Sequence, residues 1–227
     1  MVFSSAPFLF LFLPIVLIAY YNPIIKSLAF KNAVLIVSSI FFYAWGEPIY
    51  VLLMLGSIII NWALGLVVDK NRDNKKSKAA LVLSVIVNIG MLFVFKYLTF
   101  TLENINALLH TDFNTLNITL PIGISFFTFQ AMSYVIDVYR GNGEVQKNPC
   151  YVALYISFFP QLIAGPIVRY QTIADQIKNR SENFDDFTNG VCRFMIGFIK
   201  KVLIANNVAV VADGIFDGEV DSVACAW

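Results

Sequence analysis

The chain has 227 residues, of which 58% are hydrophobic and only 14% are charged. Soluble domains contain roughly 45–50% apolar and about 25% charged residues, so a soluble domain of this length cannot bury so much apolar surface and we expect a membrane protein. The net charge of +1 excludes a strongly basic surface for nucleic acid. The single histidine excludes a multi-histidine metal site, and the 3 cysteines include no Cys-x-x-Cys pair.

Four apolar windows in the N-terminal half predict membrane-spanning helices, because crossing a bilayer takes about 20 mostly apolar residues. The windows are residues 7–20, with a kink near Pro14, and residues 32–46, 48–68 and 79–95. The first window lacks the basic segment and the cleavage site of a secretory signal, so we interpret it as a retained helix.

The connections between these windows predict the orientation, because cytoplasmic connections carry an excess of Lys and Arg. The connection 69–78 is strongly basic, whereas the tight turn at 46–48 and the stretch 101–117 contain neither Lys nor Arg. The fourth helix should run on towards Phe100, with Lys96 reaching the interface. We therefore expect the N-terminus outside, the basic connections in the cytoplasm, and 101–117 as an external loop.

Two apolar segments in the second half of the chain are broken by Pro and Gly. Residues 120–138 should cross the membrane and end in the cytoplasm, and residues 148–168 are long enough to cross but contain Pro160, Gly165 and Pro166. Basic residues follow at Arg169, Lys178 and Arg180. Broken backbone at membrane depth survives only where protein or a water-filled cavity satisfies it. We prefer a re-entrant segment that enters and returns beside a site; a plain sixth span is the alternative.

The last helical stretch, residues 187–211, carries Arg193, Lys200 and Lys201. Each charge would cost about 2.5–3.5 kcal/mol at the bilayer centre, so we expect an interfacial or cavity-lining helix. It follows a polar, acidic stretch, residues 179–187, that suits a cytoplasmic loop. The whole chain, residues 1–227, is predicted to be a single membrane domain, an all-α polytopic helical bundle with re-entrant or broken segments.

The candidate site residues surround the predicted break. Gln161 and Arg169 flank Gly165 and Pro166, where a bent backbone leaves amides and carbonyls free for a ligand, and Arg binds phosphate or carboxylate in a forked geometry. The alternatives are an intrahelical contact for Gln161 and a positive-inside anchor for Arg169. Lys200 and Lys201 face either an anionic donor or lipid headgroups, with the lipid interpretation favoured.

His110 is the only side chain with an ordinary pKa close to neutral, and it lies beside Asp112 in the predicted external loop. Nothing nearby in the sequence supplies a nucleophile or an oxyanion hole. We interpret it as a solvated loop residue and not as a general base.

Several long motifs resemble the membrane-bound O-acyltransferase family, in particular the branch of the alginate O-acetyltransferase membrane subunit. They are SIFFYAWGEP at 39–48, LPIGISFFTFQ at 120–130, YVIDVYRG at 134–141 and FFPQLIAGPIVR at 158–169. The resemblance covers nearly the whole chain in order.

The resemblance implies an enzyme of a bacterial cytoplasmic membrane with no bound cofactor. The family takes an acyl group, usually acetyl, from a cytoplasmic thioester donor, either acyl-CoA or an acyl carrier. It passes the group towards hydroxyls of an extracytoplasmic polysaccharide or to an extracytoplasmic acyltransferase partner. The break at 160–166 would then help to wall the tunnel between donor and acceptor.

The resemblance also implies an incomplete catalytic site. Family members are about twice this length, and their active histidine lies in the second half, so its counterpart is expected beyond Trp227, where an apolar helix is beginning. His110 does not match that histidine in position or setting, and no residue of this chain is therefore assigned the catalytic role. We expect the chain to be an N-terminal portion of such a protein, a fragment or a natural truncation, and to be inactive alone.

Two other functions are compatible with the composition. One is a small permease or lipid-handling membrane protein, against which stand the absence of an internal repeat and of paired ionisable residues inside the clean spans. The other is a non-catalytic subunit that scaffolds a partner.

Overall fold

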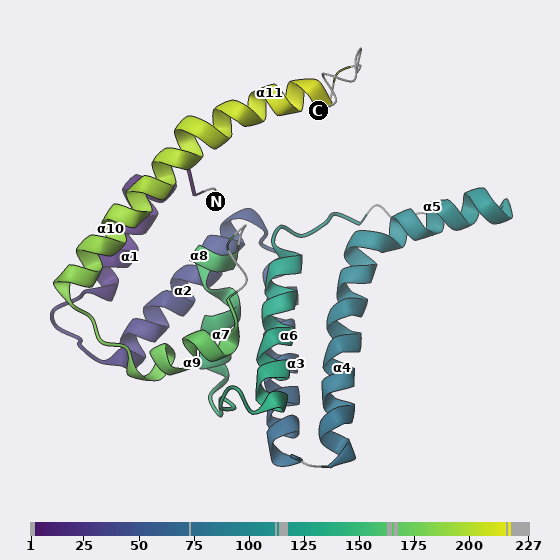
Figure 1. The fold of residues 1–227 in the computed structure, drawn as a ribbon, viewed down its shortest axis with the longest axis horizontal. Coiled ribbons are helices and arrows are strands. Elements are labelled where there is room, and N and C mark those ends of the chain that lie inside the picture. Colours follow the sequence, from purple (N-terminus) through teal and green to yellow (C-terminus); the bar gives the residue numbers. More distant parts are fainter. Residues whose placement is uncertain are drawn as a thin grey trace. The chain divides into compact units, whose positions relative to one another are not determined.

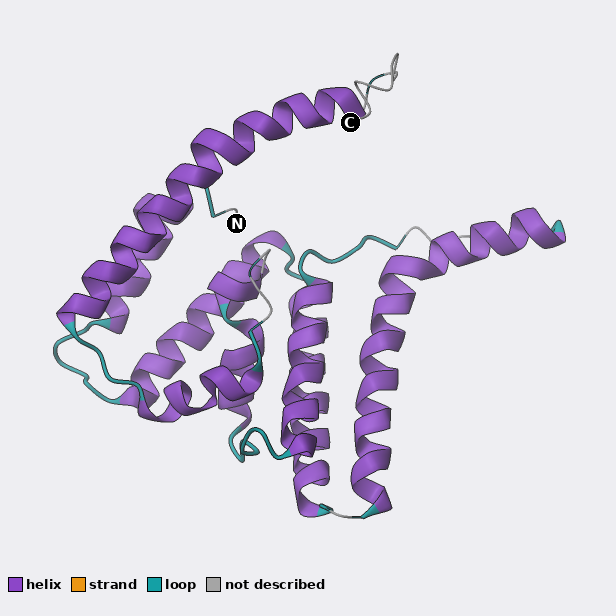
Figure 2. Ribbon diagram, in the orientation of Figure 1, coloured by secondary structure: helices purple, strands orange, loops and turns teal. Residues whose placement is uncertain are grey.

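The computed structural model describes residues 3–72, 74–111, 113, 118–162, 165, 168–216 and 218. Every regular element among these residues is a helix, and four helices are long and apolar enough to cross a membrane. The predicted all-α membrane helical bundle is confirmed (Figures 1 and 2). Backbone contacts divide the chain into unit 1, Ile15–Arg180, and unit 2, which joins the segment before Ile15 to the segment that begins at Ser181.

The described helices occur in the following order. The N-terminal helix consists of a π-helical turn, Phe8–Phe12, and α1, Leu13–Tyr20. Unit 1 continues with α2 (Leu28–Gly46), α3 (Tyr50–Lys70), α4 (Lys75–Leu92), a π-helical turn (Phe93–Tyr97), α5 (Leu98–Leu109), α6 (Ile124–Arg140), α7 (Pro149–Ser157), α8 (Phe159–Leu162) and α9 (Tyr170–Asn179). Unit 2 contains α10 (Phe184–Ile199), a π-helical turn (Lys200–Ala205) and α11 (Asn206–Phe216).

The fourth predicted helix differs from its prediction at its C-terminal end. We expected it to end near Phe100 and to be followed by an external loop from residue 101, but helical residues continue through α5 to Leu109. Figure 1 shows α5 leaving the direction of α4 at a bend. The π-helical turn Phe93–Tyr97 lies at this bend, and such turns are a known cause of helix kinks.

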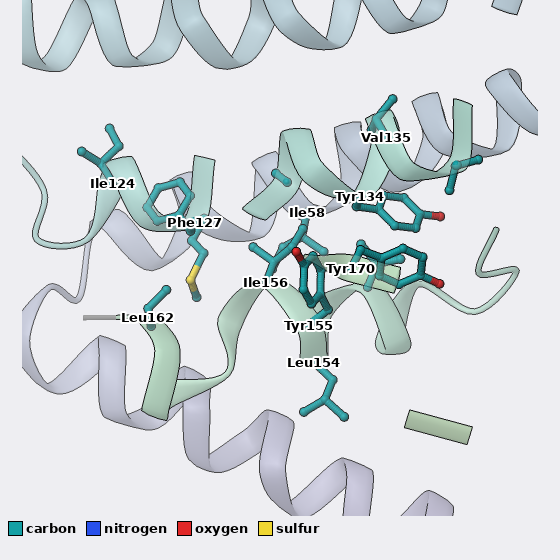
Figure 3. Close-up of a cluster of buried hydrophobic side chains, with 14 of the residues drawn as sticks. Ile58, Ile124, Phe127, Tyr134, Val135, Leu154, Tyr155, Ile156, Leu162 and Tyr170 are labelled. Carbon is teal, nitrogen blue, oxygen red and sulfur yellow. The ribbon is translucent and has the colours of Figure 1, made fainter. Parts of the chain in front are cut away.

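The helices α3, α4 and α6 pack side by side in unit 1. The contact between α3 and α6 is very close at Gly65, where a Cβ atom would lie 2.6 Å from Cε1 of Tyr134. Small residues allow such close approach between helices within a bilayer. Figure 3 shows Tyr134 beside Tyr170, whose ring centroid is 4.9 Å away, in a cluster with Tyr155 and Ile156 of α7.

A polar cluster joins α3 to α4 inside this packing. Asn61 and Asn88 exchange side-chain hydrogen bonds of 2.8 and 3.2 Å, and Ser84 Oγ donates to Asn61 Oδ1 at 2.8 Å. The remaining donors of the two amides reach Ser57 and Ser84. All four side chains are buried, and each finds a partner, as buried polar groups in a bilayer require.

Candidate functional site

The segment from α7 to α9 leaves one end of unit 1 and returns to the same end. Before α7, the backbone N–H of Gln146 donates to the Tyr134 hydroxyl at 3.2 Å; after the break, the backbone N–H of Gln171 donates to Asp137 Oδ2 at 3.2 Å. Both acceptors lie in the C-terminal half of α6. With 9 residues, α7 is only about 14 Å long, too short to cross a bilayer. The re-entrant interpretation of residues 148–168 stays a prediction.

The break in this segment contacts α2 and α6 near the middle of each helix. α7 ends at Ser157 because Phe158 leaves the helical conformation, with ψ of 110°. The backbone N–H of Phe159, which this break frees, donates to Ser39 Oγ of α2 at 3.1 Å. A neighbouring side chain thus satisfies this backbone N–H group, as expected for irregular structure at membrane depth.

Gln161 of α8 meets a partner that the sequence did not single out. Gln130, near the middle of α6, donates from Nε2 to Gln161 Oε1 at 3.1 Å. Gln130 is 1% exposed, and its own Oε1 has no hydrogen-bond partner among the described residues. The pair therefore contains a buried acceptor that can accept a hydrogen bond from a hydroxyl or N–H group.

Gly165 brings the returning chain back onto α8. A Cβ atom at this position would lie 2.8 Å from both Cα and the carbonyl oxygen of Gln161, a distance that real Cβ atoms essentially never show. The position therefore needs glycine. Pro166 lies outside the described residues. Arg169 is exposed and precedes α9, at the end of unit 1 where the segment returns.

The other candidate residues lie elsewhere. Lys200 and Lys201 are exposed in the π-helical turn of unit 2. His110 is exposed and ends α5 in the left-handed conformation, with φ of 48°. Its neighbour Asp112 lies outside the described residues. The structure thus brings Gln161 and Gly165 together, and it places Arg169 at the entrance of the same segment.

The expected position of the family's active histidine stays a prediction. The resemblance places that histidine beyond Trp227, and Trp227 itself lies outside the described residues, the last of which is Gly218. The one histidine of the sequence, His110, is far from the Gln130–Gln161 contact in the chain and lies on an exposed helix end. No catalytic role is assigned to any of the described residues.

Basic side chains gather at the end of unit 1 from which the re-entrant segment enters. Figure 1 shows the α3–α4 connection beyond the C-terminal end of α6, and α9 beside the C-terminal half of α6. Lys178 of α9 pairs with Glu144 at 2.9 Å. Because Lys178 donates a hydrogen bond to this carboxylate and adds a positive charge, the pKa of Glu144 is held below its ordinary value.

Sequence reasoning found Gln161 from the Pro and Gly around it but missed Gln130 and the Asn61–Asn88 pair. The missed signal was the presence of side-chain amides inside otherwise apolar spans. Polar residues within such spans normally face the bundle interior and pair with one another. Asn61 and Asn88 lie 27 positions apart, so only the antiparallel packing of α3 and α4 shows that they pair.

Comparison with known proteins identifies related sequences, although no family model and no solved structure matches. The chain is 41% identical over 232 residues to the probable alginate O-acetylase AlgI of Pseudomonas syringae pv. tomato, a match that covers 100% of this chain and 44% of that protein. The protein of the same name from Pseudomonas aeruginosa is 39% identical over 234 residues, with 100% and 44% coverage. The peptidoglycan O-acetyltransferase of Helicobacter pylori is 35% identical over 246 residues, with 96% and 47% coverage. The chain thus spans less than half of the length of these relatives.

Proposed function

We propose that this chain, a relative of the alginate O-acetylases in the membrane-bound O-acyltransferase family, supplies part of a membrane O-acetyltransferase. The enzyme moves an acetyl group from a cytoplasmic thioester, acyl-CoA or an acyl carrier, towards hydroxyls of an extracytoplasmic polysaccharide. The observation that carries this proposal is the match of 35–41% identity across nearly the whole chain to relatives named for O-acetylation.

The charge distribution supports an orientation for this reaction. With the basic end of unit 1 in the cytoplasm of a bacterial cell, the Lys and Arg excess agrees with the positive-inside rule. The N-terminus is then outside. A thioester donor is large and anionic, so a basic cytoplasmic entrance attracts it.

The re-entrant segment suits the wall of a transfer path. It enters from the basic end, and its Phe159–Leu162 turn reaches the middle of α2 and α6 through Ser39 and Gln130. The buried Oε1 of Gln130 can accept a hydrogen bond from a donor or acceptor molecule in that path. We assign these residues to binding and positioning. The general base and an extracytoplasmic acyltransferase partner are contributions from outside this chain.

Removing the gene that contains this sequence from its bacterium tests the proposal. Cell-surface polysaccharides from deleted and restored cells are purified, and ester-linked acetate is released with alkali and quantified. We expect the deletion to remove most of this acetate from one polymer and the restored gene to return it. Unchanged acetylation of every surface polymer would overturn the proposal.

The orientation has an independent test. In a background with Cys150, Cys192 and Cys225 replaced by Ala, a single cysteine is introduced as Lys76→Cys or Thr111→Cys. A membrane-impermeant maleimide should label Thr111→Cys in intact cells and Lys76→Cys only after permeabilisation. The reverse pattern would overturn the orientation and leave the acetylation proposal untouched.

A further inference from the structure

A cationic cleft lies between the α3–α4 connection and the C-terminal end of α6. Its volume is about 550 Å³, and its lining is almost entirely polar or charged. The lining residues are Arg72, Asn74, Lys75, Ser77, Lys78, Tyr139, Arg140 and Gly141. They come from segments more than 60 positions apart in the sequence, so the packing of α3, α4 and α6 assembles this cleft.

Basic residues outnumber acidic ones in the segments that line the cleft. Residues 69–78 contain five basic and two acidic residues, and Arg140 adds another positive charge from α6. Among the described side chains, the carboxylate of Asp69 pairs with Arg72 at 2.9 Å. Arg72 also reaches across to α6, since its Nη1 lies 3.4 Å from the position of a Cβ on Gly141. The cleft therefore attracts an anion.

The start of α4 strengthens this attraction. Helix N-termini carry a partial positive charge and expose free N–H groups, so acidic residues normally occupy the first turn. The first turn of α4 contains no acidic residue, and Lys75 and Lys78 are basic instead. Asn74 precedes the helix without a side-chain cap. The basic residues of the α3–α4 connection, Arg140 of α6 and the N-terminus of α4 thus all bring positive charge to the cleft. A bound anion would reduce the repulsion between them.

The place of the cleft in the fold indicates the kind of anion. α3 and α4 are both long and apolar enough to cross the bilayer, and the cleft lies where they leave it. Tyr139 is 40% exposed at the same level, as is usual for aromatic residues at a membrane interface. Clusters of Lys and Arg at this depth bind the headgroups of anionic lipids.

We propose that this cleft is a binding site for the phosphate headgroup of an anionic phospholipid from the adjacent leaflet. Arg72, Lys75, Lys78 and Arg140 contact the phosphate oxygens, and the start of α4 points its free N–H groups at the same anion. This assignment does not rest on the proposed acetyl transfer. It would fix the junction of α3, α4 and α6 to a negatively charged membrane surface.

The same connection contains a matched control. Lys70 and Lys76 belong to the basic stretch but do not line the cleft. A connection that is basic only to set orientation would respond to the loss of any two charges equally. A specific headgroup site distinguishes the pair Lys78 and Arg140 from the pair Lys70 and Lys76.

The test uses the full chain purified in a neutral detergent and native mass spectrometry of retained lipid. Dioleoyl-phosphatidylglycerol is compared with dioleoyl-phosphatidylcholine, which has no net charge. We expect one phosphatidylglycerol per chain and no retained phosphatidylcholine. The variant Lys78→Gln/Arg140→Gln should bind phosphatidylglycerol about tenfold or more weakly, whereas Lys70→Gln/Lys76→Gln should bind as the unchanged chain does. Circular dichroism checks that both variants remain helical.

Three results would overturn the proposal. Equal weakening in both double variants would show diffuse attraction to a basic loop. Equal retention of phosphatidylcholine would show that the net negative charge of the headgroup is not recognised. Displacement of phosphatidylglycerol by millimolar inorganic pyrophosphate would assign the cleft to a free phosphate compound. Because the comparison of the two lipids and the displacement by pyrophosphate use the unchanged chain, they stand even if a variant fails to fold.

Discussion

Two polar contacts inside unit 1 differ in how completely they are satisfied. In the Asn61–Asn88 cluster, both amides and both neighbouring serines have partners. In the Gln130–Gln161 contact, one oxygen of a side chain that is 1% exposed has no partner among the described residues. A buried polar group left unsatisfied costs about 1–3 kcal/mol. The Asn61–Asn88 cluster therefore stabilises the packing of α3 against α4. The unpaired oxygen of Gln130 destabilises the fold, and a hydrogen bond from a bound ligand would remove this destabilisation.

Breaking the satisfied cluster should have the largest effect on stability. Asn61→Leu removes the hydrogen bonds that Asn88 and Ser84 make to Asn61 and should lower the free energy of unfolding by about 1–3 kcal/mol. Thermal unfolding of the purified chain in detergent, followed by circular dichroism, measures the change. The control is Asn104→Leu, at an exposed position whose amide donates only to a carbonyl of its own helix. Equal loss in the two variants would show that the cluster does not fasten α3 to α4.

The close approach of α3 to α6 offers a comparison without any polar group. Gly65→Ala places a Cβ 2.6 Å from the buried ring of Tyr134, and overpacking of this kind costs about 1–3 kcal/mol. Gly56→Ala on the same helix meets nothing within 4 Å and should stabilise by about 0.5–1 kcal/mol because Ala favours a helix. Thermal unfolding should thus move in opposite directions. A shift in the same direction would contradict the packing of α3 against α6.

The unsatisfied contact should matter more for activity than for stability. Gln130→Met removes the buried unpaired oxygen together with the hydrogen bond to Gln161, so these two changes should nearly cancel in thermal unfolding. In the intact protein of its bacterium, ester-linked acetate formed per hour should fall by about fivefold, since one lost ligand hydrogen bond is worth about 1 kcal/mol. If Gln130→Met formed acetate normally or lost much of its stability, Gln130 would have the same purely structural role as Asn61.

The end of α2 at Gly46 could be predicted from the Gly46–Pro48 turn. The charges were a poorer guide, because α2 begins at Leu28, before Lys31, and α3 continues through Asp69 to Lys70. The extension of the fourth helix to Leu109 could not be predicted. Glu103 and two asparagines are typical of a loop, although the helix continues through α5 beyond the apolar window. The re-entrant interpretation of residues 148–168, which rests on Pro, Gly and the charges that follow them, stays a prediction. The contacts of this segment with Ser39 and Gln130 could not be predicted from the sequence, because they join residues that only tertiary packing brings together.

An exposed contact outside the bilayer should have the smallest effect and a distinct pH dependence. Lys178 lowers the pKa of Glu144, so the ionised form is the one that the fold stabilises. This contribution is present above the ordinary Glu pKa of about 4.3 and is lost as the pH falls through the lowered value. Because the Glu144 side chain is 84% exposed, solvent screens the pair and the effect is small. Glu144→Gln should therefore lower the unfolding temperature slightly at neutral pH, and its difference from the unchanged chain should shrink on acidification. A difference that grows on acidification would contradict the pairing of Glu144 with Lys178 and, with it, the connection of α9 to the end of α6.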